Sequence, residues 1–587
     1  MMRESAVLRY NGEHMFPLHD PPDEKVRTEL AAYDDLIAAL LTRRGVTTKE
    51  GADAFLDPSY DEHLHDPLLM TDMEKASRRL ADAILARERI AVWSDYDADG
   101  IPGAVVLHDF LKKAGADFDI YIPHRHDEGY GMNLSGIEKL AREGTTLVVT
   151  VDSGTTDLAP VALAKELGMD VIVTDHHLPG AELPDAFAIV NPHARTDEQY
   201  PFRELCGAGV AWKLVVATLA VEPTLREKVP AGWEKWLLDM VGIATIADMV
   251  PLAGENRVLA TYGLTVLRKS PRLGLRKLLR GMRVDQRALV EDDVGFMVAP
   301  RVNAASRVGD AKDAFDLFTT DDENEADALA KKLEKANRER KAQAGAITRA
   351  ARVRLKERNA IRDVIAMGDP DWRPALLGLV AGTIADEYER PVFLWGKEGN
   401  LSIKGSVRSG GVVHALELMQ ATEGTFEQCG GHAAAGGFTV CPDAIYDLED
   451  RLILALRSLG EEGTEADSLA VRADAAIAPE EATESLLQKI EKLAPFGQEN
   501  PKPIFLLREA VVRGIERFGK SEEHLKLKVS AGNRNIDAVM FFAKGAVARA
   551  AEQLKAGSRV HLLAHLERDT FSRGNPVRLR LVDLKLV

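Results

Sequence analysis

Cysteine is scarce in this chain of 587 residues. The three cysteines, Cys206, Cys429 and Cys441, are odd in number, far apart and without C-x-x-C spacing, which argues against a disulfide framework or a thiolate zinc site. No run approaches the roughly 18 apolar residues that cross a bilayer, and the first residues lack the apolar core of a secretion signal. We therefore expect a protein of a reducing compartment, the cytoplasm, with no membrane contact.

Two common catalytic motifs are also absent. No G-x-x-x-x-G-K-[ST] occurs, which argues against nucleotide hydrolysis by a P-loop, and no G-x-S-x-G occurs, which leaves a nucleophile-elbow serine hydrolase without support. Extensive disorder is not expected, because 45% of the residues are hydrophobic and 28% are charged. The length predicts about three to five folded domains.

The net charge is −17, which argues against a simple basic protein that coats nucleic acid through its overall positive charge. The charge is nevertheless unevenly distributed. From residue 502 to residue 587, 17 Lys and Arg stand against 9 Asp and Glu, so this segment carries +8 and the residues before it carry −25. The sequence therefore predicts a basic C-terminal module attached to an acidic body.

Short apolar runs alternate with amphipathic stretches from residue 89 to about residue 190, which predicts a parallel, doubly wound α/β lobe. Residues 322–359 are rich in Ala, Lys, Glu and Arg and contain no proline, which favours one long helix joining two lobes, with an isolated coiled coil as the alternative. A second α/β lobe follows. After a linker near residues 461–468, five strand-like runs and one helix predict a small OB-fold β-barrel, the oligonucleotide-binding type.

The expected organisation thus has five parts. They are a helical or irregular segment (1–75), the first lobe (76–321), the connecting helix (322–359), the second lobe (360–460), and the linker with the barrel (461–587).

The most specific local pattern is Ser-Asp-Tyr-Asp-Ala-Asp-Gly at residues 94–100, directly after the first predicted strand. Its three alternating carboxylates, Asp95, Asp97 and Asp99, repel one another unless a cation or hydrogen-bond donors lie among them. An EF-hand loop is excluded, because its twelfth position requires Glu and is Val106 here. A solvated acidic turn is the alternative.

Further polar residues follow other predicted strands. Asp152 comes after the third strand, and Asp175-His176-His177 comes after the fourth. Because groups just past the carboxyl ends of adjacent parallel strands converge on one crevice, we expect Asp97, Asp99, Asp152 and His176 to meet in space.

Asp248 follows a strongly apolar helical run, where a buried carboxylate needs a partner or a metal ion; capping of the helix end is the alternative. Carboxylates with one or two imidazoles favour manganese or magnesium over zinc. Two such ions activate water and hold both oxygens of a phosphoryl centre.

These segments resemble the DHH phosphoesterase family. Four motifs carry the resemblance in the first lobe, at residues 94–100, 151–156, 174–180 and 243–251. In the second lobe the glycine-rich segments resemble the DHHA1 companion domain. Residues 300–310, residues 493–505 and the barrel narrow the resemblance to the RecJ branch, whose members are 5′-to-3′ exonucleases specific for single-stranded DNA. It implies a metal-dependent hydrolase of single-stranded DNA in repair and recombination.

The resemblance also implies roles for particular residues. Two Mn²⁺ or Mg²⁺ ions would be held by Asp97, Asp99, Asp152, His176 and Asp248. His177 would contact the scissile phosphate or a metal-bound species. Residues of both lobes would contact DNA, namely Arg125, Tyr130, Arg307, Ser406, Arg408 and His432.

Single-stranded DNA is the implied partner, with single-strand-binding protein and a helicase as further candidates, and we expect a monomer. The chain departs from the family pattern at Trp93, Ser94 and Pro102, where metal preference or turnover could differ.

Other functions fit parts of the sequence. A DHH phosphoesterase acting on short oligonucleotides or cyclic dinucleotides would not need the barrel, and a non-catalytic DNA-binding scaffold would not need the intact set of acids and histidines. A manganese-dependent inorganic pyrophosphatase would share the first-lobe chemistry but is too short to explain the long helix and the barrel.

Overall fold

The computed structural model describes residues 16–125, 127–398, 402–460, 471–519, 522–543, 545–569 and 576–587. The chain divides into two compact units. The sheet unit comprises residues 53–343 and 495–501, and the barrel unit comprises residues 1–52, 344–494 and 502–587. The linker predicted near residues 461–468 lies outside the described residues. No helix in the described ranges is long and apolar enough to cross a membrane.

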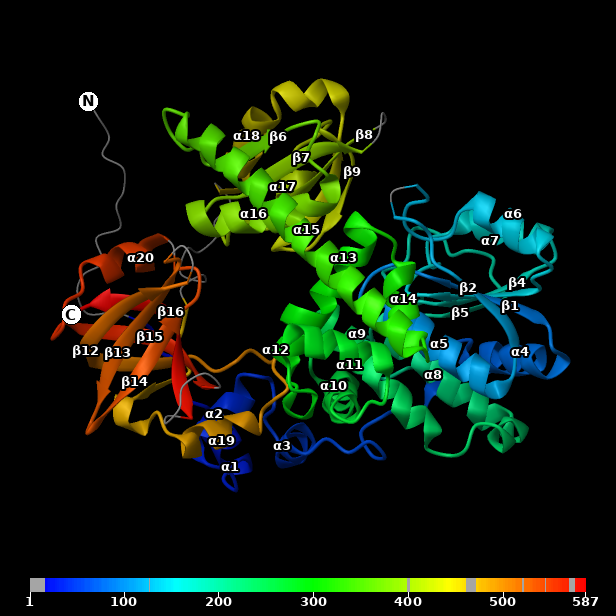
Figure 1. Ribbon diagram of the computed structural model, residues 1–587, viewed down its shortest axis with the longest axis horizontal. Helices are drawn as coiled ribbons and strands as arrows, with labels where there is room; N and C mark the ends of the chain where they lie inside the picture. Colours follow the sequence, from blue (N-terminus) through cyan, green and yellow to red (C-terminus); the bar gives the residue numbers. More distant parts are fainter. Residues whose placement is uncertain are drawn as a thin grey trace. The chain divides into compact units, whose positions relative to one another are not determined.

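A five-stranded sheet forms the centre of the sheet unit, in the order β2-β1-β3-β4-β5 (Figure 1). Every pair of neighbouring strands is parallel, which confirms the predicted doubly wound pattern. The strands are β1 (Arg89–Ser94), β2 (Asp117–Tyr121), β3 (Leu147–Val151), β4 (Asp170–Thr174) and β5 (Ala188–Val190).

Helices cover both faces of this sheet, because successive residues of a strand point to opposite sides. Ile90 and Val92 of β1 lie in one apolar core, whereas Ala91 and Trp93 lie in another. The first core includes α4 (Met73–Ala86), α5 (Gly100–Ala114) and α8 (Gly207–Val221), and the second includes α6 (Leu134–Arg142) and α7 (Leu158–Glu166). Burial on both faces explains why the strands are almost continuously apolar.

A helical region completes the sheet unit after α8. Its helices include α9 (Leu238–Ala247), α10 (Gly254–Leu267), α11 (Leu273–Met282), α13 (Ala299–Val308) and α14 (Lys312–Thr319). The predicted connecting helix is α15 (Glu323–Lys356), which has 34 residues and therefore spans about 50 Å. It begins in the sheet unit and ends in the barrel unit.

The barrel unit contains a mixed sheet in the order β6-β7-β8-β10-β9. Only its β6–β7 pair is parallel. Its elements are β6 (Ile365–Gly368), α16 (Pro374–Tyr388), β7 (Val392–Glu398), β8 (Ser402–Arg408), α17 (Ala415–Gln420), β9 (Phe426–Gly431), β10 (Ala435–Val440) and α18 (Leu448–Gly460). This is the predicted second α/β lobe.

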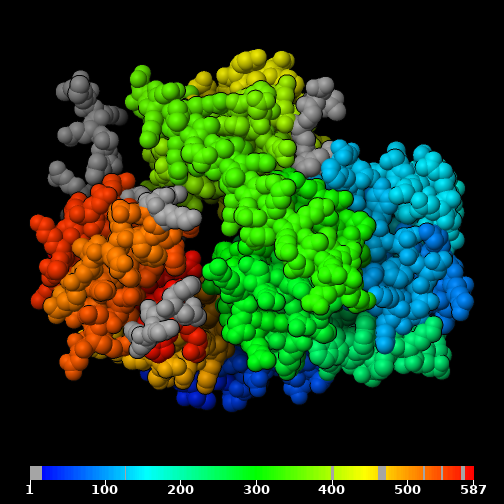
Figure 2. Space-filling model, viewed as in Figure 1, coloured from blue at the N-terminus to red at the C-terminus, as the bar shows by residue number. Residues whose placement is uncertain are grey.

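Five strands then close into a barrel, because β12 pairs with both β13 and β15. Of the five neighbouring pairs around the barrel, β14–β16 is parallel and the others are antiparallel. The barrel consists of β12 (Phe505–Phe518), β13 (His524–Ala531), β14 (Arg534–Met540), α20 (Gly545–Glu552), β15 (Arg559–Arg568) and β16 (Val577–Leu586). The short strand β11 (Ala475–Ile477) pairs with β12. Four further helices in the described part of the chain lie outside the two lobes and the barrel: α1 (Glu24–Glu29), α2 (Asp35–Thr42), α3 (Lys49–Leu56) and α19 (Glu484–Glu491). Figure 2 shows the same view with every atom drawn, coloured along the chain as in Figure 1. Both predicted lobes, the long helix and the OB barrel are thus confirmed.

Candidate metal centre

Polar residues stand directly after four of the five parallel strands. Asp95 follows β1, Asp152 follows β3, Asp175 follows β4, and Asn191 follows β5. The carboxyl ends of parallel strands lie at one edge of the sheet, where the intervening crevice receives ligands in such folds. The structure therefore places the sequence-predicted acids and histidines at this edge.

His176 lies at the centre of the cluster. Its Nε2 atom is 3.1 Å from Asp152 Oδ1, 3.6 Å from Asp99 Oδ2 and 3.7 Å from Asp248 Oδ2. Ligand atoms of Asp95, Asp97 and Asp152 form a second group, and those of Asp152, His176 and His177 a third, each within 4.8 Å. Asp152 belongs to both of these groups, so its carboxylate could contribute to either of two cation sites.

Backbone N–H groups fix two of the carboxylates. Asp97 Oδ1 accepts hydrogen bonds from the N–H groups of Asp99 and Gly100, where α5 begins. Asp99 accepts from the N–H groups of Gly207 (2.6 Å) and Ala208 (2.8 Å), at the start of α8. A Cβ atom at Gly207 would lie 2.6 Å from Asp152 Cβ, so only glycine allows α8 to approach this closely.

Asp175, the first residue of the DHH triplet, orients the histidine that ends it. Its Oδ1 atom lies 2.8 Å from His177 Nδ1, and its Oδ2 atom accepts from the N–H group of Thr155. These partners outweigh burial and hold the pKa of Asp175 at about 2. Asn191 donates to the carbonyl of His177 (2.9 Å), so the backbone of this histidine is fixed as well.

The charge balance of the cluster fits divalent cations. Burial, together with neighbouring carboxylates, raises the pKa of Asp99 to about 7 and that of Asp248 to about 8, and raises those of Asp95 and Asp152 well above their usual range. Asp95 Oδ1 and Asp152 Oδ1 are buried and accept no hydrogen bond. Burial and the charge of His177 lower the pKa of His176 to about 4, which leaves its imidazole neutral and able to coordinate a metal.

Three of the predicted DNA contacts also lie in the sheet unit. Tyr130 Oη donates to the carbonyl of Asp152 (3.0 Å) and lies 3.1 Å from His177 Nδ1. The Arg125 guanidinium lies 4.8 Å from the ring centre of Tyr96, inside the acidic motif. Burial and the charges of Arg125 and Arg340 lower the pKa of Arg307 to about 10, so the Arg307 guanidinium lies within the electrostatic reach of both other arginines.

The other three lie in the mixed sheet of the barrel unit. Ser406 and Arg408 belong to β8, opposite Gly437 and Ala435 of β10. His432 stands in the exposed turn between β9 and β10, where its N–H group donates to the carbonyl of Ala435.

Sequence reasoning named Asp95 and Asp175 in their motifs but gave them no role in the site, and it did not name Asn191 or Arg340. The first three share a signal that could have found them, because each is the first residue after a parallel strand. Arg340 had no such signal, since it is one of many charged residues on α15.

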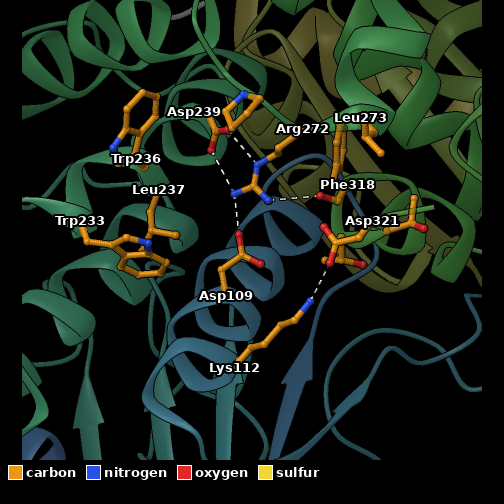
Figure 3. Close-up of a pocket in the computed structure, with 13 residues that line it drawn as sticks. Asp109, Lys112, Trp233, Trp236, Leu237, Asp239, Arg272, Leu273, Phe318 and Asp321 are labelled. Carbon is orange, nitrogen blue, oxygen red and sulfur yellow. Dashed lines mark hydrogen bonds and ion pairs between the residues drawn. The ribbon is translucent and has the colours of Figure 1, made fainter. Parts of the chain in front are cut away.

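A separate pocket of about 460 Å³ in the sheet unit shares no residue with this cluster (Figure 3). The guanidinium of Arg272 lies beside it and pairs with Asp239 (2.8 Å) and Asp109 (2.7 Å), and Trp233 and Trp236 line its opposite side. Arg272 therefore forms ion pairs with carboxylates of the pocket itself, which indicates a structural role for this arginine.

A parallel sheet whose carboxyl edge carries this set of acids and histidines defines a metal-dependent phosphoesterase of the DHH class. The chain matches the DHH family, N-terminal domain, over residues 89–245, the DHHA1 domain over residues 360–458, and the RecJ OB domain over residues 473–583.

Its relatives narrow this class. The chain is 35% identical to the single-stranded-DNA-specific exonuclease RecJ of Bacillus subtilis, over 96% of this chain and 70% of that protein. It is 33% identical to RecJ of Escherichia coli, over 80% of this chain and 84% of that protein. The crystal structure of RecJ from Thermus thermophilus in complex with Mn²⁺ superposes with a TM-score of 0.77 at 28% identity, over 97% of this chain and 78% of the other. A second structure of that protein contains Mg²⁺. The chain belongs to the RecJ family of single-stranded-DNA-specific exonucleases.

Proposed function

We propose that this protein is a Mn²⁺- or Mg²⁺-dependent exonuclease that degrades single-stranded DNA from the 5′ end, in DNA repair and recombination. The observation that carries the proposal is the cluster of acids and histidines at the strand ends, in a chain that matches RecJ relatives over most of its length. The proposal includes the five-part domain organisation, with a phosphoesterase lobe, a connecting helix, a second lobe and a C-terminal barrel after the N-terminal segment.

Asp97, Asp99, Asp152, His176 and Asp248 would hold the two cations, with Asp95 as a further candidate ligand. Divalent cations supply charge stabilisation for phosphate oxygens and lower the pKa of water. Because Asp152 can contribute to both groups of ligands, its loss should disturb both ions.

His177 would stabilise the charge that develops on the scissile phosphate. Its Nδ1 atom is engaged by Asp175, so Nε2 is the atom that can donate to a phosphate oxygen. Burial lowers the pKa of His177, but the hydrogen bond and charge of Asp175 outweigh it and raise the pKa to about 9. Tyr130, whose pKa is raised by burial and by Asp175, keeps its proton and limits the movement of the imidazole.

Arginines beside the cluster would bind the DNA backbone. The charges of Arg125 and Arg340 act on Arg307, and a phosphate bound beside Arg307 would offset that repulsion. Ser406, Arg408 and His432 of the second lobe are proposed to contact DNA through the glycine-rich strands β8 to β10.

The outer surface of the barrel offers a platform for single-stranded DNA. Phe541 and Phe542 are 40% and 63% exposed, and His524 packs against both at 5.4 Å and 4.7 Å between ring centres. Phe518 extends this aromatic cluster, with its ring centre 5.0 Å from that of His524. Aromatic rings exposed on an OB barrel stack on bases of any sequence.

Cations flank the rings. The Arg578 guanidinium lies 5.6 Å from the ring centre of Phe541, and Lys526 Nζ lies 6.0 Å from that of Phe518. Arg578 and Arg580 share one carboxylate, Glu567, and Lys526 pairs with Glu516. This surface suits a phosphate backbone with stacked bases and supports the exonuclease over a phosphoesterase of dinucleotides, which has no use for it.

An exonuclease ladder tests the proposal. Purified protein and its Asp152→Ala variant are incubated with Mn²⁺ and a 5′-phosphorylated oligonucleotide labelled at the 3′ end, single-stranded or duplex. We expect progressive shortening of the single strand alone, abolished in the variant. Binding without cleavage by either protein would instead identify a DNA-binding scaffold, and cleavage of dinucleotides alone would identify the small-substrate phosphoesterase.

We also propose that the enzyme works as a monomer in the cytoplasm, with single-strand-binding protein and a helicase supplying its substrate. The free cysteines Cys206, Cys429 and Cys441 are compatible with a reducing compartment. Sedimentation of the purified protein and pull-down with each partner test these points.

A further inference from the structure

A short segment between β2 and α6 carries Tyr130 to the metal centre. Tyr130 contacts both the carbonyl of Asp152 and the ring of His177, as described above. Glu128 holds the beginning of this segment, because its carboxylate accepts from the hydroxyl of Tyr121 (2.5 Å) and from the N–H group of His124 (2.7 Å). Glu128 fixes the backbone before Tyr130, so the contacts of the residues after Tyr130 decide how firmly its side chain is positioned.

Two side chains from other elements hold those residues. The indole Nε1–H of Trp93 donates to the carbonyl of Gly131 at 3.2 Å. Asp157 Oδ2 accepts from the N–H group of Met132 at 2.7 Å. Both hydrogen bonds thus act on one peptide group, the one that joins Gly131 to Met132, one residue after Tyr130.

The local geometry shows that this approach is close. Gly131 has a φ of +78°, and a Cβ atom there would lie 2.7 Å from Asp157 Oδ1. Only glycine therefore allows the segment to reach Asp157. Trp93 has no exposed surface and stacks on Tyr121, with ring centres 4.1 Å apart and planes 14° from parallel. Its donor is consequently held in one direction.

Asp157 makes this contact in place of its usual one. It occupies the N-cap position of α7, where an aspartate normally accepts a hydrogen bond from its own helix and stabilises that helix. Here its side chain makes no cap hydrogen bond and accepts from Met132 instead.

We propose that Trp93 and Asp157 are positioning residues, which hold Tyr130 against His177 by fixing both ends of the peptide group between Gly131 and Met132. The proposal rests on the proposed exonuclease function and adds two residues to which no role had been given. It also accounts for Trp93, one of the departures from the family pattern, as a hydrogen-bond donor to the segment and not as a contact of the metal ions.

A double-mutant cycle tests whether Asp157 acts through Tyr130. We expect Asp157→Ala and Tyr130→Phe each to lower kcat on single-stranded DNA about tenfold, and the double variant to be no slower than either single one by more than about twofold. Asp157→Asn keeps an acceptor for the Met132 N–H group and should retain kcat within about twofold. Independent effects that multiply to about a hundredfold would overturn the proposal, as would an Asn variant as slow as the Ala variant.

Trp93→Phe keeps the stack on Tyr121 and removes only the donor, with an expected loss in kcat of about threefold. Trp236→Phe, in the pocket of Figure 3, and Asp185→Ala, an exposed carboxylate of the same unit, are matched controls and should retain full activity. Equal losses in Trp93→Phe and in the controls would contradict the assignment.

Hydrogen exchange gives a readout that does not depend on catalysis. We expect amide exchange in residues 127–133 to accelerate in Asp157→Ala and Trp93→Phe, and to stay unchanged in both control variants. If the wild-type protein cleaves no DNA, the proposed function fails, and exchange alone then decides whether the two residues hold the segment. Unchanged exchange in both positioning variants would refute the proposal.

Discussion

Metal binding at the cluster should be strongly pH-dependent. The carboxyls of Asp99 and Asp248 have pKa values raised to about 7 and about 8, because they are buried beside other carboxylates. A carboxyl with a raised pKa favours its neutral form in the folded protein. Its contribution to stability is therefore present below about pH 4 and is lost as pH rises through 7 to 8.

A cation reverses this dependence, since it binds only the ionised carboxylates. At pH 6 the metal-free Asp99 carboxyl, with a pKa of about 7, is protonated about ten times as often as not. A cation that binds a protonated carboxyl must displace its proton. For each displaced proton, the apparent affinity for the cation falls about tenfold per pH unit below the pKa, which is about 1.4 kcal/mol of binding free energy. Between pH 8 and pH 6 we therefore expect the apparent affinity for Mn²⁺ to fall at least tenfold.

Isothermal titration of the metal-free protein with Mn²⁺ measures this at pH 6, 7 and 8. Repeating each titration in buffers of different ionisation enthalpy gives the number of protons released. We expect at least one proton to be released per chain near pH 7, from Asp99 and Asp248. An affinity that does not change with pH, together with no proton release, would refute the assignment of these buried carboxyls as ligands.

Three further outcomes follow from particular contacts. Asp175→Asn should lower kcat roughly ten- to a hundredfold, because it loosens His177, and should shift the basic limb of the pH–rate profile from near 9 toward lower pH; an unchanged profile would contradict the role of this pair. Gly207→Ala should abolish Mn²⁺ binding in calorimetry, because the added Cβ atom meets Asp152; wild-type affinity would count against the close approach. Phe541→Ala should weaken binding of single-stranded DNA in fluorescence anisotropy by about 1–3 kcal/mol without changing hydrolysis of a dinucleotide, whereas Tyr446→Ala, an exposed ring outside the barrel, should do neither; equal affinities of the two variants would exclude the aromatic surface.

The parallel sheet could be predicted from the sequence, because strands buried on both faces leave apolar runs that are visible without any partner. The strand-end rule likewise predicted that Asp152 and His176 would meet, since it depends only on topology. The barrel could be predicted from alternating residues such as Leu525, Leu527 and Val529, whose side chains fill its interior.

The rest of the site depends on contacts between distant segments. Asp99 is fixed by the N–H groups of Gly207 and Ala208, more than a hundred residues away, and no local pattern announces that pairing. Asp157 could be predicted as a helix cap, but its use by Met132 follows only from the packing of α7 beside the β2–α6 segment.

The direction and strand specificity of cleavage test the central claim most directly. One single-stranded oligonucleotide is prepared with a non-hydrolysable linkage at its 5′ end or at its 3′ end, and each is incubated with Mn²⁺ and the wild-type or Asp152→Ala protein. We predict that the 5′ block alone stops degradation, and that Asp152→Ala degrades neither substrate. Degradation that the 3′ block stops, or cleavage that persists in Asp152→Ala, would contradict a 5′-directed exonuclease whose chemistry resides in this metal centre.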